Sequence, residues 1–376
     1  MRILVIKLRG IGDCLLSIPA IRALREKYPS GYISVLTEVK CADVFEGNVL
    51  INEIIKIPSG SGIFYMCRFI SKIRKQKFDL VIDLFCNPRS AIITLLSGAE
   101  TRVGMDLRLR KYCYNKRVKG ASFIKYAVEA NLDVVRSIGA DTNDKSININ
   151  ISEEDKLFAK NFLDGTIPVF PKERGQSPES GDSPHFFIAI NPVASWSTKS
   201  WGIKKFAVLA DLLIRKYNAI ILILWGPGEY STARSTADLM KNKPLVLPDT
   251  KLKQSAAVLN ICRLLITNDS AVKHIAVALD IPTITLFGST NTAAWHPPDN
   301  NRHIAIYKDI ICRPCDKVKC DNTSFPIECM EEISVEDCMN AITGILGKMG
   351  TGSFFIKQAN VTTRLSSGTP DPNILL

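Results

Sequence analysis

Five short polar segments of this 376-residue chain combine residue types that bind phosphates or move protons. The first follows an apolar run at the N-terminus and contains Gly10, Gly12 and Asp13. Glycines at a strand-to-helix turn let a ligand approach the backbone closely. Position 15 is leucine rather than the third glycine of the dinucleotide-binding fingerprint, so the segment does not predict a nicotinamide site. Asp13 either acts on a substrate or only caps the following helix.

The second and third segments lie in the C-terminal half of the chain. Residues 195–201 read Ser-Trp-Ser-Thr-Lys-Ser-Trp. The hydroxyls of Ser197 and Thr198 can donate hydrogen bonds to phosphate oxygens, and Lys199 adds positive charge. Residues 225–229 read Trp-Gly-Pro-Gly-Glu. Glu229 either accepts hydrogen bonds from ribose hydroxyls or only begins a helix.

The fourth and fifth segments follow further along the same half. Asp269 and Ser270 open a predicted helix, whose first backbone N–H groups suit an anion. His274 lies four residues after Ser270 and therefore on the same helix face, where it is either a ligand-binding or a structural histidine. Residues 287–290 (Phe-Gly-Ser-Thr) form another loop that could reach a phosphate.

The elements that must position these segments alternate between strands and helices. Short apolar runs separated by helical patterns predict mostly parallel sheets. Ligands of such sheets bind at the carboxyl ends of the strands, and each polar segment directly follows a predicted strand. The predicted strands are 2–7, 32–36, 54–57, 80–84, 186–191, 219–224, 264–267 and 283–287. The predicted helices are 12–28, 63–77, 203–217, 230–241, 270–279 and 334–346.

This alternation predicts an α/β protein of two domains, for which the chain length is suitable. We place the first domain at 1–165 and the second at 185–350. Residues 166–184, rich in proline, glycine, serine and charge, are predicted to form a linker or loop. Residues 351–376 show no clear periodicity, and we expect a poorly ordered tail. Two such domains in succession predict a cleft in which a shared substrate would lie.

The net charge of +11 is concentrated in the N-terminal half. Residues 1–150 carry 24 Lys and Arg against 14 Asp and Glu, whereas the remainder carries 24 against 23. Seven basic residues and one acidic residue fall within residues 102–119. Such a field favours a phosphorylated substrate or an anionic membrane surface, or it serves only solubility. No recognised nucleic-acid-binding module is present, so a nucleic-acid partner is not expected.

The sequence predicts a cytoplasmic protein. No apolar run approaches the ~20 residues of a membrane span. Lys7 and Arg9 interrupt what would have to be the apolar core of a signal peptide. Most of the eleven cysteines stand singly in apolar segments and are predicted to be reduced. A cluster near the C-terminus is compatible either with a bound metal ion or with reduced thiols in a loop. This cluster consists of Cys312, Cys315, Cys320 and Cys329.

The five segments together resemble those of glycosyltransferase family 9, which includes the ADP-heptose:lipopolysaccharide heptosyltransferases. The resemblance rests on KLRGIGD, SWSTKSW, WGPGE, NDSAVKH and LFGST, which occur in this order between residue 1 and about residue 345. It implies the GT-B fold, in which two Rossmann-like domains face each other across a cleft. The N-terminal domain would take the acceptor and the C-terminal domain the nucleotide sugar.

The resemblance also implies the reaction. A heptose or related sugar would pass with inversion from a nucleotide-diphosphate donor, expected to be ADP-heptose, to a lipopolysaccharide core or similar lipid-linked, acidic acceptor. No metal or other cofactor is expected. The enzyme would work in the cytoplasm, with peripheral binding to the cytosolic face of the inner membrane as a further expectation.

Individual roles follow from the same resemblance. Asp13 would be the general base for the acceptor hydroxyl, and Lys199 would stabilise the departing diphosphate. Glu229 would bind the ribose, and Asp269 the transferred sugar. The other implied donor-site residues are Ser197, Thr198, Ser270, Ala271 and His274. The implied acceptor-site residues are Lys7, Arg9 and Gly12.

One segment departs from the family pattern. Relatives commonly carry Gly-Pro-Met or Gly-Leu-Ser where this chain has Ala271, Val272 and Lys273. We expect the Cβ of Ala271 to crowd the diphosphate and Lys273 to add charge beside it. Two alternatives therefore stay open. One is a nucleotide-sugar epimerase of GT-B-like fold, and the other is a catalytically silent nucleotide-sugar-binding protein.

Overall fold

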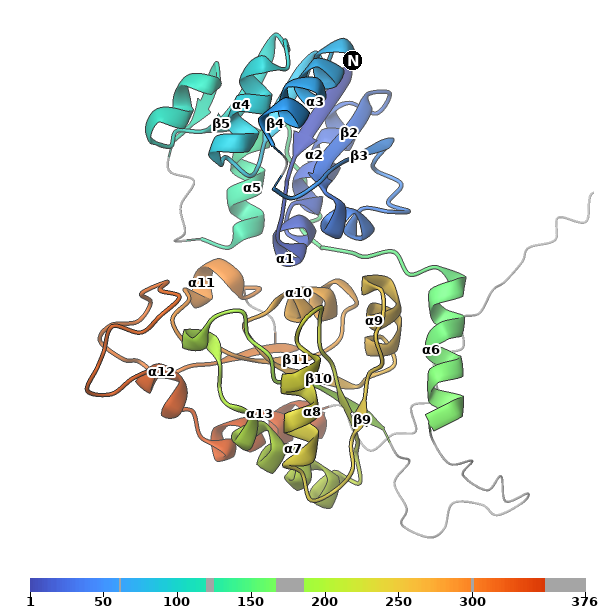
Figure 1. Cartoon of the computed structure of the whole chain (residues 1–376), viewed down its shortest axis with the longest axis vertical. Helices are drawn as coiled ribbons and strands as arrows, with labels where there is room; N and C mark the ends of the chain where they lie inside the picture. The colour runs from blue at the N-terminus through green and yellow to red at the C-terminus, as the bar shows by residue number, and fades with distance from the viewer. Residues whose placement is uncertain (61, 120–124, 167–185, 299–300, 349–376) are drawn as a thin grey trace, which may run out of the picture.

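Two six-stranded parallel sheets form the framework of the protein (Figure 1). The computed structural model describes residues 1–60, 62–119, 125–166, 186–298 and 301–348. The predicted tail at 351–376 lies outside these residues, as does the predicted linker apart from Thr166, the last residue of a helix. Within the described residues, no helix is long and apolar enough to cross a membrane.

The first sheet has the strand order β3-β2-β1-β4-β5-β6, with every neighbouring pair parallel. Its strands are β1 (Arg2–Ile6), β2 (Tyr32–Glu38), β3 (Glu53–Ile57), β4 (Leu80–Asp83), β5 (Thr101–Met105) and β6 (Lys116–Val118). Its helices are α1 (Ile11–Leu15), α2 (Ile18–Lys27), α3 (Ile63–Lys75), α4 (Pro88–Leu96) and α5 (Ala127–Arg136). Two 3-10 helices accompany them, η1 (Val39–Val44) and η2 (Arg108–Cys113).

The second sheet repeats this order as β12-β11-β10-β7-β8-β9. Its strands are β7 (Phe187–Asn191), β8 (Ile220–Ile223), β9 (Leu245–Val246), β10 (Leu264–Asn268), β11 (Thr283–Leu286) and β12 (His303–Ile306). The helices are α7 (Ile203–Tyr217), α8 (Tyr230–Asp238), α9 (Leu252–Leu259), α10 (Ala271–Ala278), α11 (Thr292–Trp295), α12 (Glu328–Glu331) and α13 (Val335–Lys348), with η3 (Ser197–Lys199). Both sheets therefore have the doubly wound order, and the predicted α/β class is confirmed.

The predicted strands are all present, whereas the predicted helix at 12–28 is two helices. α1 ends at Leu15 and α2 begins at Ile18, with Ser17 between them. Pro19 lies in the first turn of α2, where its missing backbone N–H is tolerated. The same missing N–H means that the backbone hydrogen bonds of α1 cannot continue through this position. The Ser17 hydroxyl donates to the Cys14 carbonyl at 2.7 Å and closes the end of α1. This break leaves α1 as a short separate helix that carries Asp13.

Two helix pairs join the halves of the molecule. Helix α6 (Glu153–Thr166) packs against α9 of the second half, and α1 packs against α10 (Figure 1). One cluster of buried apolar side chains, which includes Leu15, Ala159 and Leu259, continues through both halves. The carboxyl edge of the first sheet therefore meets the second domain at α10.

Candidate active site

The strand order defines where ligands bind in each sheet. The order reverses between β1 and β4 in the first sheet and between β7 and β10 in the second. Ligands of doubly wound sheets lie outside the carboxyl ends of the strands at such switch points. The segment with Asp13 follows β1, and those with Lys199 and Asp269 follow β7 and β10. The three segments expected to carry the chemistry thus lie at the two switch points.

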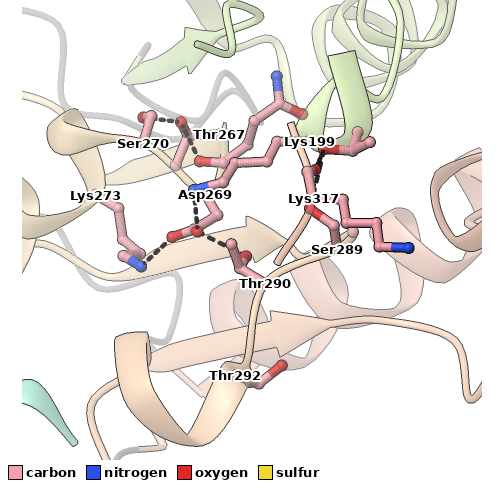
Figure 2. Close-up of polar contacts among 12 residues, drawn as sticks. Lys199, Thr267, Asp269, Ser270, Lys273, Ser289, Thr290, Thr292 and Lys317 are labelled. Atoms are coloured by element: carbon pink, nitrogen blue, oxygen red, sulfur yellow. Dashed lines mark hydrogen bonds and ion pairs between the residues drawn. The ribbon is translucent and has the colours of Figure 1, made fainter. Parts of the chain in front are cut away.

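Asp269 is the centre of a buried polar cluster after β10 (Figure 2). Its Oδ2 accepts hydrogen bonds from the Lys199 ammonium at 2.9 Å and from the Thr290 hydroxyl at 2.8 Å. Its Oδ1 accepts a hydrogen bond from the Lys273 ammonium at 2.5 Å. The loops after β7, β10 and β11 therefore meet at one carboxylate.

The charges of this cluster hold Asp269 ionised. Burial alone would raise the pKa of the carboxyl, but the neighbouring Lys273 and Lys199 together keep it well below its usual range. Burial lowers the pKa of Lys273, an effect that Asp269 opposes. Asp269 is thus a buried anion whose hydrogen bonds fix three loops.

Lys273 takes a different position from the one its sequence neighbourhood suggested. We expected it to add charge beside a bound diphosphate, but its side chain is fully buried and turned towards Asp269 (Figure 2). The Lys273 ammonium also lies 4.7 Å from the centre of the Phe287 ring. Lys273 is therefore on the inner face of α10. Ala271 is the first residue of α10, after Ser270 at the N-cap position.

Asn268 shapes the loop that carries Lys199. Its side-chain amide donates to the carbonyls of Pro192 at 3.0 Å and Val193 at 3.2 Å. Its Oδ1 accepts the backbone N–H of Trp201 at 3.1 Å. One buried side chain at the end of β10 thus fixes both ends of the loop after β7. Asn268 is the first residue of the NDSAVKH segment, but no sequence pattern predicts its contacts with the loop after β7.

Ser197 and Thr198 face another part of the chain. Their hydroxyls donate to the carbonyls of Val318 at 3.2 Å and Lys317 at 2.6 Å. Ser289 in turn donates to the Thr198 hydroxyl oxygen at 3.0 Å. A hydroxyl has one proton to donate, so Thr198 must release Lys317 before it can donate to a phosphate.

Arg313 holds the loop after β11, and sequence reasoning missed it. Its guanidinium donates to the Gly288 carbonyl at 2.6 Å and to the Thr292 hydroxyl at 2.5 Å. It also lies over the Tyr307 ring, 4.3 Å from its centre. Arg313 stands between Cys312 and Cys315, and no local sequence pattern indicates its contacts with the loop after β11.

Gly288 is the tightest backbone position in this region. A Cβ at this position would overlap the Thr198 carbonyl oxygen and would lie 2.7 Å from the Met330 sulfur. We expect Gly288→Ala to displace the loop that carries Lys199, with a loss of about 1–3 kcal/mol in the free energy of unfolding. Thermal melting and calorimetric titration with ADP would measure both effects.

The matched control is Gly344→Ala, because nothing lies within 4 Å of a Cβ at position 344. Gly344 lies inside α13, where alanine is the better helix former, so the control should be unchanged or slightly stabilised. Wild-type stability and ADP affinity in Gly288→Ala would show that the loop tolerates displacement.

Asp13 presents a carboxylate at the carboxyl edge of the first sheet. Its side chain is 38% exposed, and its Oδ1 lies 3.7 Å from the Lys7 ammonium. Lys7 is itself buried and donates to the Leu84 carbonyl at 3.1 Å. Gly10 precedes α1 with φ of +87°, a conformation that favours glycine. Arg9 is exposed, with its guanidinium 5.8 Å from the Phe85 ring centre.

Gly12 and His274 bring the two domains into contact. A Cβ at Gly12 would lie 2.5 Å from the His274 Cδ2. His274 is buried, and no described residue hydrogen-bonds to its Nδ1. Burial, reinforced by Lys273, lowers the pKa of His274 well below its ordinary value, so the ring is neutral. His274 packs against α1 and thereby sets the position of Asp13 relative to α10.

Glu229 and Ser270 have local partners. Glu229 Oε2 accepts the Gly226 N–H at 2.8 Å and closes the turn after β8. The Ser270 hydroxyl lies 3.1 Å from that of Thr267. Glu229 follows β8 and Ser270 follows β10, so both lie at the carboxyl edge of the second sheet, and their contacts with a nucleotide stay predictions.

Cys312, Cys315 and Cys320 lie in the loop that follows β12, and Cys329 lies in α12. The eleven cysteines of the chain, all within the described residues, are free thiols. Among the residues that the structure describes, no group of three or more His, Cys, Asp or Glu side chains is placed to hold a metal ion. Metal binding by Cys312, Cys315, Cys320 and Cys329 therefore stays a prediction, with no such ligand set assembled among these residues. The loop instead contacts Ser197, Thr198 and Ser289 through its backbone.

Two doubly wound domains thus meet at their switch points, with lysine and hydroxyl groups in one and a carboxylate in the other. The profile of glycosyltransferase family 9 (heptosyltransferase) matches residues 66–325. The chain belongs to this family, and the resemblance seen in its motifs is confirmed.

Individual relatives agree with this assignment. Lipopolysaccharide heptosyltransferase 3 of Escherichia coli is 24% identical over 309 residues, which cover 78% of this chain and 85% of that protein. A family 9 glycosyl transferase from Veillonella parvula superposes with a TM-score of 0.77 at 23% identity, over 92% of this chain and 97% of that one. The structure of E. coli ADP-heptose lps heptosyltransferase II superposes with a TM-score of 0.72 at 20% identity, over 93% of this chain and 100% of that one. These structures confirm the GT-B fold.

Proposed function

We propose that the protein transfers a heptose or related sugar, with inversion, from ADP-heptose to a lipopolysaccharide core or similar lipid-linked, acidic acceptor. The observation that carries the proposal is the packing of α1 on α10. Helix α1 carries Asp13, and α10 begins directly after Asp269 and Ser270, so this packing supports a shared site between the two domains. The similar E. coli protein named above as an ADP-heptose lps heptosyltransferase supports the choice of donor.

In this reaction the two domains contribute different groups. Asp13 removes the proton from the acceptor hydroxyl as its oxygen attacks the anomeric carbon. Lys199 and the first N–H groups of α10 stabilise the negative charge that grows on the departing ADP. Glu229 and the 225–229 turn lie after β8, next to β7 in the sheet, and bind the ribose. In the proposed reaction, Lys199 and the N-terminus of α10 together stabilise the charge on the diphosphate, for which other transferases use a metal ion.

Calorimetric titration with ADP, UDP, GDP and CMP, without added metal, tests the donor site. The proposal expects selective binding of ADP. Preference for UDP or GDP would assign a different donor to the same fold. Absence of binding to all four nucleotides would contradict the proposed donor site, whereas selective binding without any transfer would favour the catalytically silent binding protein. Conversion of the free nucleotide sugar without an acceptor would favour the epimerase.

Exposed apolar side chains beside basic ones support binding to the cytosolic face of the inner membrane. Ile63 and Phe64, exposed by 74% and 86%, begin α3 after β3. Leu109, exposed by 82%, lies in η2 after β5. Helix α4 contacts both α3 and η2, so these residues share the carboxyl edge with Asp13. Exposed basic residues of these segments include Arg68, Lys72, Arg108, Lys116 and Arg117.

This surface predicts that Phe64→Ser weakens binding to vesicles of phosphatidylcholine and phosphatidylglycerol by about tenfold, because a buried phenylalanine contributes ~1.5–3 kcal/mol. Co-sedimentation would measure the change. Phe325→Ser is the matched control, because Phe325 is 66% exposed but belongs to the loop after β12 of the other domain. If wild type and Phe64→Ser bound the vesicles equally well, α3 would not be part of the membrane-binding surface.

A further inference from the structure

Three charged side chains share one buried site after β10. Asp269 carries one negative charge, and the ammonium groups of Lys199 and Lys273 carry two positive charges. The cluster therefore has one positive charge that Asp269 does not compensate. The side chain of Lys199 is 16% exposed to solvent, whereas that of Lys273 is 0% exposed.

Lys273 has no route to a ligand of its own. Its ammonium lies within hydrogen-bond reach of Asp269 Oδ1 and stands over the Phe287 ring. Any effect of this residue on a nucleotide must therefore pass through Asp269. Lys199 bonds the other oxygen of the same carboxylate and also lies 4.5 Å from the centre of the Trp196 ring.

We propose that Lys273 is a positioning residue whose charge neutralises Asp269 and so releases Lys199 to bind the diphosphate of the donor. This inference rests on the proposed function. In the present arrangement Lys199 donates to Asp269 at 2.9 Å, and a movement of its ammonium towards a phosphate weakens this contact. Asp269 then keeps Lys273 and Thr290 as partners. Without Lys273, the same movement would leave a buried carboxylate with a neutral hydroxyl only, which is strongly unfavourable.

The test compares ADP with adenosine, which lacks the diphosphate. We expect Lys273→Met to weaken ADP binding in calorimetry by about tenfold or more, as for other close buried charge pairs. Adenosine affinity should stay the same, because the nucleoside does not require Lys199. Equal losses for ADP and adenosine would indicate a general disturbance of the site and overturn the proposal.

A double-mutant cycle then asks whether the effect passes through Lys199. In a Lys199→Ala background, Lys273→Met should cause no further loss of ADP affinity. Additive losses, or unchanged ADP binding by the single Lys273→Met variant, would refute the positioning role. If wild type binds no ADP, the proposed function itself fails, and that result is distinct from a failure of this inference.

Two further variants keep the test decisive. Lys273→Gln removes the charge but keeps an N–H donor for Asp269, and it replaces Lys273→Met if that variant does not fold. Lys216→Met removes one lysine charge at the end of α7, where the ammonium bonds the Thr343 hydroxyl at 3.1 Å. It should bind ADP like wild type, and a loss there would mean that net charge rather than position 273 is responsible.

Discussion

Asp13→Asn is expected to lower the rate of sugar transfer by about 10²- to 10⁴-fold and to leave ADP affinity unchanged. Asparagine has nearly the same shape as aspartate but cannot accept the proton of an acceptor hydroxyl. The donor nucleotide is assigned to the other domain, so its binding should not respond to this change. Steady-state transfer kinetics and calorimetry on the same preparation would measure the two quantities.

The control for Asp13 is an aspartate of the same domain away from the site. Asp79 lies at the amino edge of the first sheet, where its carboxylate accepts the backbone N–H of Arg2 at 2.6 Å. Asp79→Asn should transfer sugar at the wild-type rate. Normal transfer by Asp13→Asn would show that another group is the base and would leave α1 with a structural role alone.

Lys199→Met should weaken ADP binding by about 100-fold and lower transfer by about 10²- to 10³-fold, because a preorganised cation is lost where charge develops. The variant should still fold, since Asp269 keeps the hydrogen bonds from Lys273 and Thr290. Calorimetry would give the affinity, and circular dichroism during heating would confirm the fold.

Lys205→Met provides the comparison for this second prediction. Lys205 lies on α7, and its ammonium donates to the Glu331 carbonyl at 2.7 Å rather than facing the switch point. It should bind ADP normally. If Lys199→Met bound ADP with wild-type affinity, the phosphates would have to bind elsewhere in the second domain.

The sequence predicted the strands and the polar segments after them, because both depend on local pattern. Apolar runs such as Ile220–Ile223 must be buried, and the loops that follow parallel strands gather at one edge. The break between α1 and α2 was missed, although Pro19 is a local signal, because the apolar periodicity continues across it. The helix predicted at 334–346 is present as α13, and Ser334 and Asp337 exchange hydrogen bonds at its start.

Contacts between distant segments could not be predicted in this way. Lys273 was expected near a ligand, but the face of α10 that it occupies is turned to Asp269 and Phe287. Arg313 acts on the loop after β11, 23 to 25 residues earlier in the chain. The packing of Gly12 on His274 joins two domains. Each of these contacts depends on the tertiary arrangement and leaves no local pattern.

The most direct test of the central claim is transfer from ADP-heptose to truncated lipopolysaccharide acceptors, followed by mass spectrometry. We expect wild type to release ADP and to form acceptor that is heavier by one heptose, and we expect Asp13→Asn to form both products about 10²- to 10⁴-fold more slowly. Protein that binds ADP selectively but transfers heptose to no acceptor, or that transfers it equally well without Asp13, would contradict the account.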